Sequence, residues 1–310
     1  MNIFQFFQAL PSDFWENLLI SVIGAFIGSG GAILVFYLTI WHDRKKEVER
    51  KELHYKNKLR YFHSLVESVI DSVEKQILNM REYTKKVKKN PFEYNYLNIV
   101  VNENITRISE RVDQEELYHS YLQIISQGKE EHELLQSLNV VDYLNAALKS
   151  TKDSLFQTTT YTSELEKQYS ALSERLLDEA GSELNSIKTT DPTGFAKNDF
   201  FIFLNTSILS YYNEIQDEQT IPLREFKFIR PFKLGLMSNF RAIAISDKLL
   251  TMCKDCTHLY SEIANRYTEI ANDIERDAVD METRLPILGK INETINNVLQ
   301  NFAKCNKSNG

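Results

Sequence analysis

The sequence predicts an all-α protein, in which one N-terminal transmembrane helix continues into a long helical stalk and a cytoplasmic helical bundle or coiled-coil domain. Three observations lead to this fold class. Residues 18–41 contain no Asp, Glu, Lys, Arg or His. Apolar residues recur at steps of three and four along most of the remaining chain, which is the spacing of one helix face. Glycine and proline, which interrupt helices, number only 10 and 6 in 310 residues.

The uncharged segment is long enough to cross a membrane as a helix. Its 24 residues would extend about 36 Å, at about 1.5 Å per residue, against a hydrocarbon core of about 30 Å. The only two tryptophans, Trp15 and Trp41, flank it, and indole rings favour the membrane interface. Arg44, Lys45 and Lys46 follow at once. These five residues are the predicted interface anchors.

The charges on either side of this segment predict its orientation. Asp13 and Glu16 precede it without any Lys or Arg, whereas all 36 Lys and Arg residues follow it. The positive-inside bias places the N-terminus outside and the C-terminal part in the cytoplasm, as in a single-pass protein of the cell inner membrane. A cleavable signal peptide is the competing interpretation. The lack of a basic start and of a small-residue cleavage site argues against it.

Four parts are predicted along the chain. They are an extracytoplasmic amphipathic segment (1–16), a transmembrane helix (17–42), a helical stalk (43–90) and a cytoplasmic α-helical domain (91–310). In the first part, Ile3, Phe4, Phe7 and Leu10 share one helical face. In the stalk, the apolar face consists of Tyr55, Leu59, Phe62, Val66, Val69, Val73, Ile77 and Met80.

Within the cytoplasmic domain, residues 91–104 are predicted to be an irregular connection, and residues 105–127 and 130–188 to be helices separated by Gly128. Residues 189–194 read as a turn, with Asn198 or Asp199 capping a buried helix that follows. Residues 221–233 alternate Phe with Arg or Lys, which favours a short strand or extended loop. A long helix is then expected from 237 to 284, followed by a break at Pro286 and Gly289 and a last helix to about 303.

Composition excludes several classes of function. The chain carries 36 basic and 43 acidic residues, a balance that argues against general nucleic-acid binding. Three cysteines form no even disulfide framework and suit a reducing compartment. Cys253, Cys256 and His258 supply at most three soft ligands, and a structural zinc site usually needs four. No catalytic residue, metal site or cofactor is predicted, and the chain is not expected to be an enzyme.

A stripe of small and polar residues runs along the transmembrane helix. Its members recur at steps of four and three, and they are Asn17, Ser21, Gly24, Gly28, Gly31 and Val35. Glycine lowers helix stability, so the close approach that it permits has a function here. Two uses remain open. The stripe is either a packing seam between two helices or, with several copies around an axis, the lining of a narrow water-filled path.

A second candidate site lies in the alternating segment, where Arg224, Lys227, Arg230 and Lys233 could contact an anionic ligand or an acidic partner. The competing interpretation is an edge strand protected by charge.

The layout of a small-residue span, a continuous stalk and a large helical cytoplasmic part resembles single-span membrane effectors of bacterial anti-phage systems. The resemblance covers the order of the parts and no shared motif, so it implies no functional residue. It implies an oligomeric effector in membrane lipid that forms a pore or ion channel. A protein partner or a small anionic signal would gate it through the cytoplasmic domain. The alternative is a membrane-anchored helical scaffold or signalling receptor without a pore, and helical chemoreceptor-like proteins share this layout.

Overall fold

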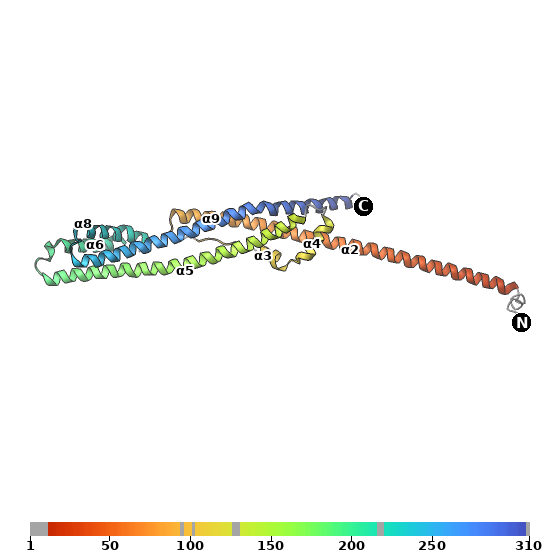
Figure 1. Ribbon diagram of the computed structural model, residues 1–310, viewed down its shortest axis with the longest axis horizontal. Helices are drawn as coiled ribbons and strands as arrows, with labels where there is room; N and C mark the ends of the chain where they lie inside the picture. Colours follow the sequence, from red (N-terminus) through yellow and green to blue (C-terminus); the bar gives the residue numbers. More distant parts are fainter. Residues whose placement is uncertain (1–11, 94–95, 101–102, 126–130, 216–219, 308–310) are drawn as a thin grey trace. The chain divides into compact units, whose positions relative to one another are not determined.

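A computed structural model describes residues 12–93, 96–100, 103–125, 131–215 and 220–307 (Figure 1). All regular secondary structure in these ranges is helical, which confirms the all-α fold class. The chain divides into two compact units. Unit 1 comprises Met1–His63, Asp113–Glu131 and Ile295–Gly310, and unit 2 comprises Ser64–Val112 and His132–Thr294. The predicted amphipathic face of Ile3, Phe4, Phe7 and Leu10 lies outside the described residues.

The first described helix, α2 (Ser12–Lys89), is continuous over 78 residues. The sequence contains no Gly or Pro between Gly31 and Pro91, so nothing removes a backbone hydrogen bond along this stretch. The predicted joining of the apolar segment to the helix that follows it is confirmed. The predicted apolar face is buried from Leu59 to Met80, while Tyr55 is half-buried.

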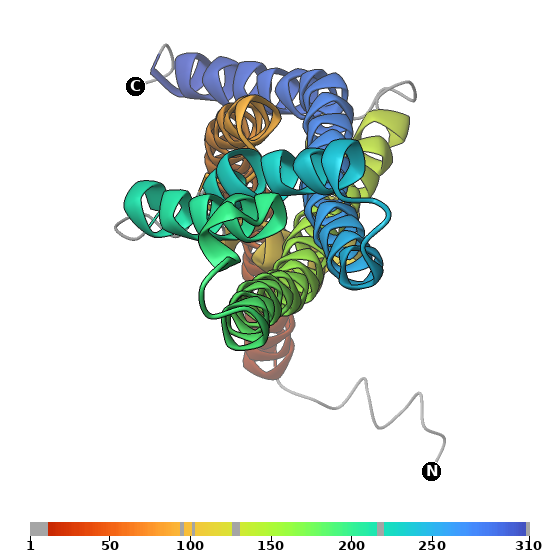
Figure 2. The same cartoon turned by 90° about the vertical axis from the view of Figure 1, so that its left-hand side faces the viewer.

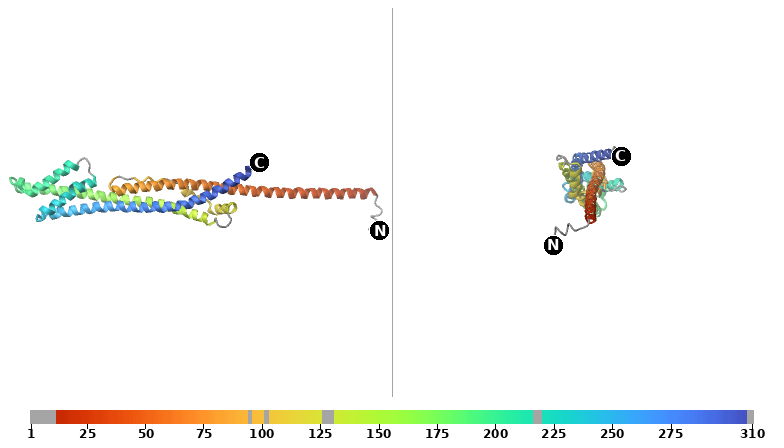
Figure 3. Two further views of the ribbon diagram at one scale, coloured as in Figure 1. Left: turned by 90° about the horizontal axis from the view of Figure 1, so that it is seen from above. Right: turned by 90° about the vertical axis from the view of Figure 1, so that its right-hand side faces the viewer.

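Unit 1 contains α2 up to His63, the short helix α4 (Gln114–Ile124) and the C-terminal end of α9 (Ala244–Lys307). Its buried apolar side chains come from all three elements. They are Leu59 and Phe62 of α2, Leu117, Tyr121 and Ile125 at α4, and Ile295 of α9. Figure 3 shows that no other described element of unit 1 covers the first part of α2.

Unit 2 is built on long helices, namely the end of α2, most of α5 (Glu131–Thr190) and most of α9. Polar side chains join them in pairs. Arg81 of α2 donates to Glu282 of α9 over 2.5 Å. Thr151 of α5 donates to Asp277 of α9 over 2.8 Å. Two short helical turns, α3 (Glu103–Thr106) and the π-helix η1 (Arg107–Arg111), follow the connection after Pro91.

One end of unit 2 is closed by short helices rich in phenylalanine. They are η2 (Phe195–Lys197), α6 (Asp199–Ile215), α7 (Ile221–Arg224), the π-helix η3 (Glu225–Ile229) and α8 (Arg230–Asn239). Helices α6 and α8 lie side by side (Figure 2), and the Phe203 and Phe232 rings stack between them with centroids 5.3 Å apart. The predicted cap is confirmed, because Asn198 Oδ1 accepts from the backbone N–H groups of Phe200 and Phe201.

The predicted strand or extended loop at residues 221–233 is wrong, because this segment is helical throughout. Burial recurs every four residues, at Arg224, Phe228, Phe232 and Leu236, and overrides the apparent two-residue alternation. Pro222 favours this outcome. It occupies the first turn of α7, where a missing N–H leaves no hydrogen bond unmade. Pro231 directly follows the π-helix η3, at the junction with α8.

Two predicted helix boundaries also differ. The expected break at Pro286 and Gly289 is wrong, since α9 continues through both residues. Pro286 removes only one N–H donor from the helix. The helix continues because Met281, Leu288 and Ile291, on either side of Pro286, are buried. The single helix expected at 105–127 is interrupted at Val112, which is extended, before α4 begins. Gly128, the predicted separator, lies outside the described residues.

Candidate functional site

The apolar segment of α2 is exposed along its whole length. It is the one helix in the described chain that is long and apolar enough to cross a membrane, and its apolar window is 0% buried. The described residues leave its large apolar side chains uncovered: Phe26 is 76% exposed and Ile27 is 70% exposed. A continuous apolar surface of this extent is unfavourable in water, so its working environment supplies either lipid or another protein surface.

The stripe residues Asn17, Ser21, Gly24, Gly28, Gly31 and Val35 are all exposed along this helix. A Cβ atom added at Gly24, Gly28 or Gly31 would meet nothing within 4 Å. The small size of these residues is therefore not required by packing against any residue that the structure describes. Whatever approaches the stripe closely comes from outside the described chain.

The predicted interface anchors after the segment are exposed too. Trp41 is 60% exposed, and the Lys45 Nζ lies 6.0 Å from the centroid of its ring, at the edge of the range for a cation–π contact. Arg44 and Lys46 are also exposed on α2. Trp15 belongs to the first turns of α2, and its side chain is outside the described part of the structure.

The four cations of residues 224–233 do not form one open basic surface. Arg224 is 4% exposed and donates to Ser173 Oγ over 2.9 Å. Lys227 pairs with Glu214 over 3.6 Å, and Lys233 is half-buried. Arg230 is exposed but its Nε donates to Glu225 over 3.1 Å. The extended geometry on which the anionic-ligand prediction depended is absent, and partners within the chain engage at least three of these cations.

No local sequence pattern indicates that this segment carries a buried polar network. The Glu225 side chain is fully buried and accepts from Arg230 and, over 3.3 Å, from the Tyr169 hydroxyl. Burial and the nearby Glu225 carboxylate raise the pKa of Tyr169, so this phenol remains a donor. The Arg230 guanidinium also covers the Phe226 ring at 4.4 Å. A buried carboxylate with these partners fixes the register of α7, η3 and α8 against α5.

The cysteine cluster lacks the geometry of a metal site. Cys253 and Cys256 are buried on α9, whereas His258 is exposed. Burial raises the pKa of the Cys256 thiol to about 12, and it raises that of Cys253 as well, so neither is a ready thiolate ligand. Among the described residues, no group of three His, Cys, Asp or Glu side chains is arranged to hold a metal ion.

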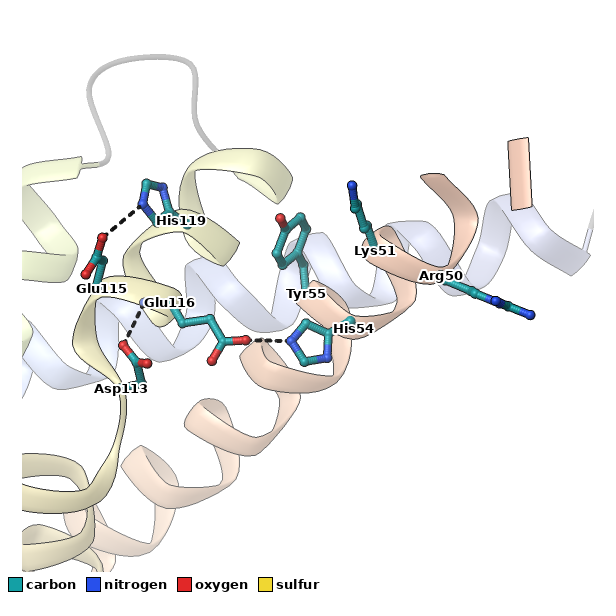
Figure 4. Close-up of a pocket in the computed structure, with 8 residues that line it drawn as sticks. All are labelled: Arg50, Lys51, His54, Tyr55, Asp113, Glu115, Glu116 and His119. Atoms are coloured by element: carbon teal, nitrogen blue, oxygen red, sulfur yellow. Dashed lines mark hydrogen bonds and ion pairs between the residues drawn. The ribbon is translucent and has the colours of Figure 1, made fainter. Parts of the chain in front are cut away.

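A cleft in unit 1 that is lined by ionisable side chains was also missed by sequence reasoning. It has a volume of about 540 Å³ and lies where α4 packs against α2 (Figure 4). Residues from the two helices line it: Arg50, Lys51, His54 and Tyr55 from α2, and Asp113, Glu115, Glu116 and His119 at α4. Figure 4 shows the Glu116 carboxylate directed at His54, while Arg50 points away from the group.

Glu116 is the residue that joins the two helices. Its Oε1 accepts from His54 Nε2 over 2.6 Å, and its Oε2 contacts Lys58 Nζ. A carboxylate only accepts hydrogen bonds, so the His54 Nε2–H is the donor. The backbone N–H of Glu116 donates to Asp113 Oδ1 over 3.0 Å, which caps α4. Asp113 and Glu116 have the spacing of a capping box, a local signal that marks the start of α4 but not its partner.

Comparison of the chain with protein families, with curated proteins and with solved structures finds no match.

Proposed function

We propose that the protein is an oligomeric, single-pass membrane effector whose α2 segments associate in the membrane and form a pore under the control of the cytoplasmic helical domain. The observation that carries this proposal is the fully exposed apolar window of α2, with glycines that no described residue approaches. Lipid would cover the larger apolar side chains, and other copies of α2 would cover the stripe.

The pore is favoured by the polar start of the stripe. Asn17 and Ser21 lie on the same face as Gly24 and Gly28, so several copies around an axis would direct hydrogen-bonding groups toward a narrow path. Control by the cytoplasmic part is favoured by the continuity of α2, which passes from the apolar window into the folded units without a break. The orientation follows from the basic residues after Trp41.

One observation favours a second function. The stripe contains no charged residue, so it offers no electrostatic basis for ion selectivity. In this alternative, α2 is a dimer seam that anchors a helical scaffold or signalling receptor, and the membrane segment only localises the protein. A role in anti-phage defence is part of the first proposal and is supported by the layout of the chain alone.

The proposal is tested by planar-bilayer conductance of the full-length protein beside two glycine variants. Gly28→Leu fills the stripe, whereas Gly30→Leu makes the same change about 200° around the helix, at a position that is equally open. Both changes raise helix propensity by about 1 kcal/mol, so loss of helix cannot explain a difference between them. We expect discrete currents from the wild type and Gly30→Leu, and none from Gly28→Leu.

Equal currents from the two variants would refute the stripe as the lining or seam of the pore. If the wild type itself is silent, a variant with an unrelated apolar helix at residues 18–41 separates the two functions. Retained protection against phage in cells with that variant would establish the anchored scaffold, because the scaffold needs only an anchor.

A further inference from the structure

The contact between α4 and α2 has the properties of a regulatory restraint. Helix α4 has 11 residues, a length at which an isolated helix is marginal in water. It is preceded by the extended Val112, so it is not the continuation of another helix. Its stability therefore depends on packing, through Leu117 and Tyr121, which are 1% and 0% exposed. An element of this kind can dock or detach without unfolding the long helices.

The docked position of α4 is specified by charge. Glu116 contacts two groups, His54 and Lys58, which lie one turn apart on the same face of α2. The neighbouring acid on α4, Glu115, differs in this respect. It is 87% exposed and pairs with His119 of its own helix over 3.8 Å. Glu116 thus holds α4 on α2, while Glu115 does not.

The face of α2 that α4 contacts belongs to the same unbroken helix as the apolar segment. From Trp41 to His54 the helix advances about 20 Å, at about 1.5 Å per residue, with no Gly or Pro between them. A restraint on α2 at His54 and Lys58 therefore limits how α2 can rotate or associate at its apolar end. Helix α4 is covalently joined at Val112 to unit 2, so a change in unit 2 can act on it directly.

We propose that α4 docked on α2 through Glu116 holds the effector in its resting state, and that detachment of α4 is the step by which the cytoplasmic domain activates the membrane segment. The proposal rests on the proposed membrane function, since it names the element that regulates it. The anchor is Glu116, with His54 and Lys58 as its partners.

The docking is tested by hydrogen exchange of the full-length protein, read at the peptide covering residues 113–125. Glu116→Lys places a cation against His54 and Lys58, and we expect exchange in this peptide to rise about tenfold. Glu115→Lys is the matched control, with the same charge change in the same first turn of α4, and it should leave exchange within about twofold. The exchanged pair Glu116→Lys with Lys58→Glu should restore protection.

Planar-bilayer conductance of the same proteins tests the regulation. Without an added signal, the pore formed by Glu116→Lys should be open for a larger fraction of the time than the wild-type pore, whereas Glu115→Lys and the exchanged pair should match the wild type. Equal exchange in Glu116→Lys and Glu115→Lys would overturn the docking role of Glu116. Raised exchange in Glu116→Lys, with currents equal to those of a conducting wild type, would overturn the regulatory role.

The exchange result also separates this proposal from the membrane function. Absence of current from every protein, including the wild type, would count against the pore and against activation through α4 together. The exchange measurement would then still decide whether Glu116 holds α4 on α2.

Discussion

Substitution of two glycines in unit 2 by alanine should change stability in opposite directions. Gly235 lies in α8 and Gly181 in α5, and both are inside helices. A Cβ atom at Gly235 would lie 2.3 Å from Cε2 and 2.7 Å from Cζ of Phe203, well inside van der Waals contact. A Cβ atom at Gly181 would meet nothing within 4 Å.

The Phe203 ring has little room to move away from the new methyl group. It stacks on Phe232 at an interplanar angle of 9°, and the Phe240 ring lies on it with centroids 5.0 Å apart. Overpacking of this kind costs about 1–3 kcal/mol. The higher helix propensity of alanine stabilises the folded protein by about 0.5–1 kcal/mol and so offsets part of this cost. We therefore expect Gly235→Ala to lose about 0.5–2 kcal/mol, and Gly181→Ala to gain about 0.5–1 kcal/mol.

Thermal unfolding of the detergent-solubilised full-length protein, followed by far-UV circular dichroism, measures both effects. A change of about 1 kcal/mol corresponds to about 2 °C in Tm for a chain of this size. Gly235→Ala should therefore unfold a few degrees below Gly181→Ala. If the two variants unfold at the same temperature, or if Gly235→Ala is the more stable, the packing of Phe203 against α8 is incorrect.

Two further predictions concern titratable groups in unit 2, of which Glu166 is half-buried and the two cysteines are buried. Burial raises the pKa of Glu166 above its ordinary value of 4.5, with a smaller opposing effect from the Tyr267 hydroxyl, which donates over 3.4 Å. Folding then favours the protonated acid, so its contribution to stability falls as pH rises from 4.5 through the folded pKa. Glu166→Gln should raise Tm by about 1 °C at pH 7 and leave it unchanged at pH 4, and a gain of equal size at both pH values would contradict this cause. Cys253 and Cys256 should react with a thiol reagent at pH 8 at least about 100-fold more slowly in the folded protein than in denaturant, because burial raises both thiol pKa values. Peptide mapping by mass spectrometry measures this, and rapid labelling of either residue in the folded protein would show that α9 opens there.

The helices with regular apolar spacing could be predicted from the sequence. The spacing of Leu59, Phe62 and Val66 is local information, and all three side chains are buried on one face of α2. The Asn198 cap was predictable for the same reason, since it bonds to backbone groups two and three residues ahead. Such features depend only on residues within a few turns of one another.

The features that sequence reasoning missed depend on distant partners. The segment around Phe228 is helical because α6 and α9 bury one side of it, and no local pattern encodes that burial. Arg224 was predicted to be a contact for an anionic ligand or an acidic partner, but its side chain is buried and donates to Ser173, 51 residues earlier. The pairing of His54 with Glu116 spans 62 residues. The exposed α2 segment, by contrast, was evident from composition alone.

Because α2 is uninterrupted through unit 1, the angle around the helix axis between its Gly24–Gly28 face and the face that meets Glu116 is fixed. Each residue turns the helix by about 100° and advances it by about 1.5 Å. One residue added between Trp41 and His54 would therefore turn the Gly24–Gly28 face by about 100° relative to the face that meets Glu116, with almost no change in length. Seven added residues would move it by about 10 Å and nearly restore its direction. The number of residues in this interval thus sets the direction in which the Gly24–Gly28 face points relative to the face that meets Glu116. A deletion or insertion of one residue there changes this angle strongly and the length of the helix only slightly.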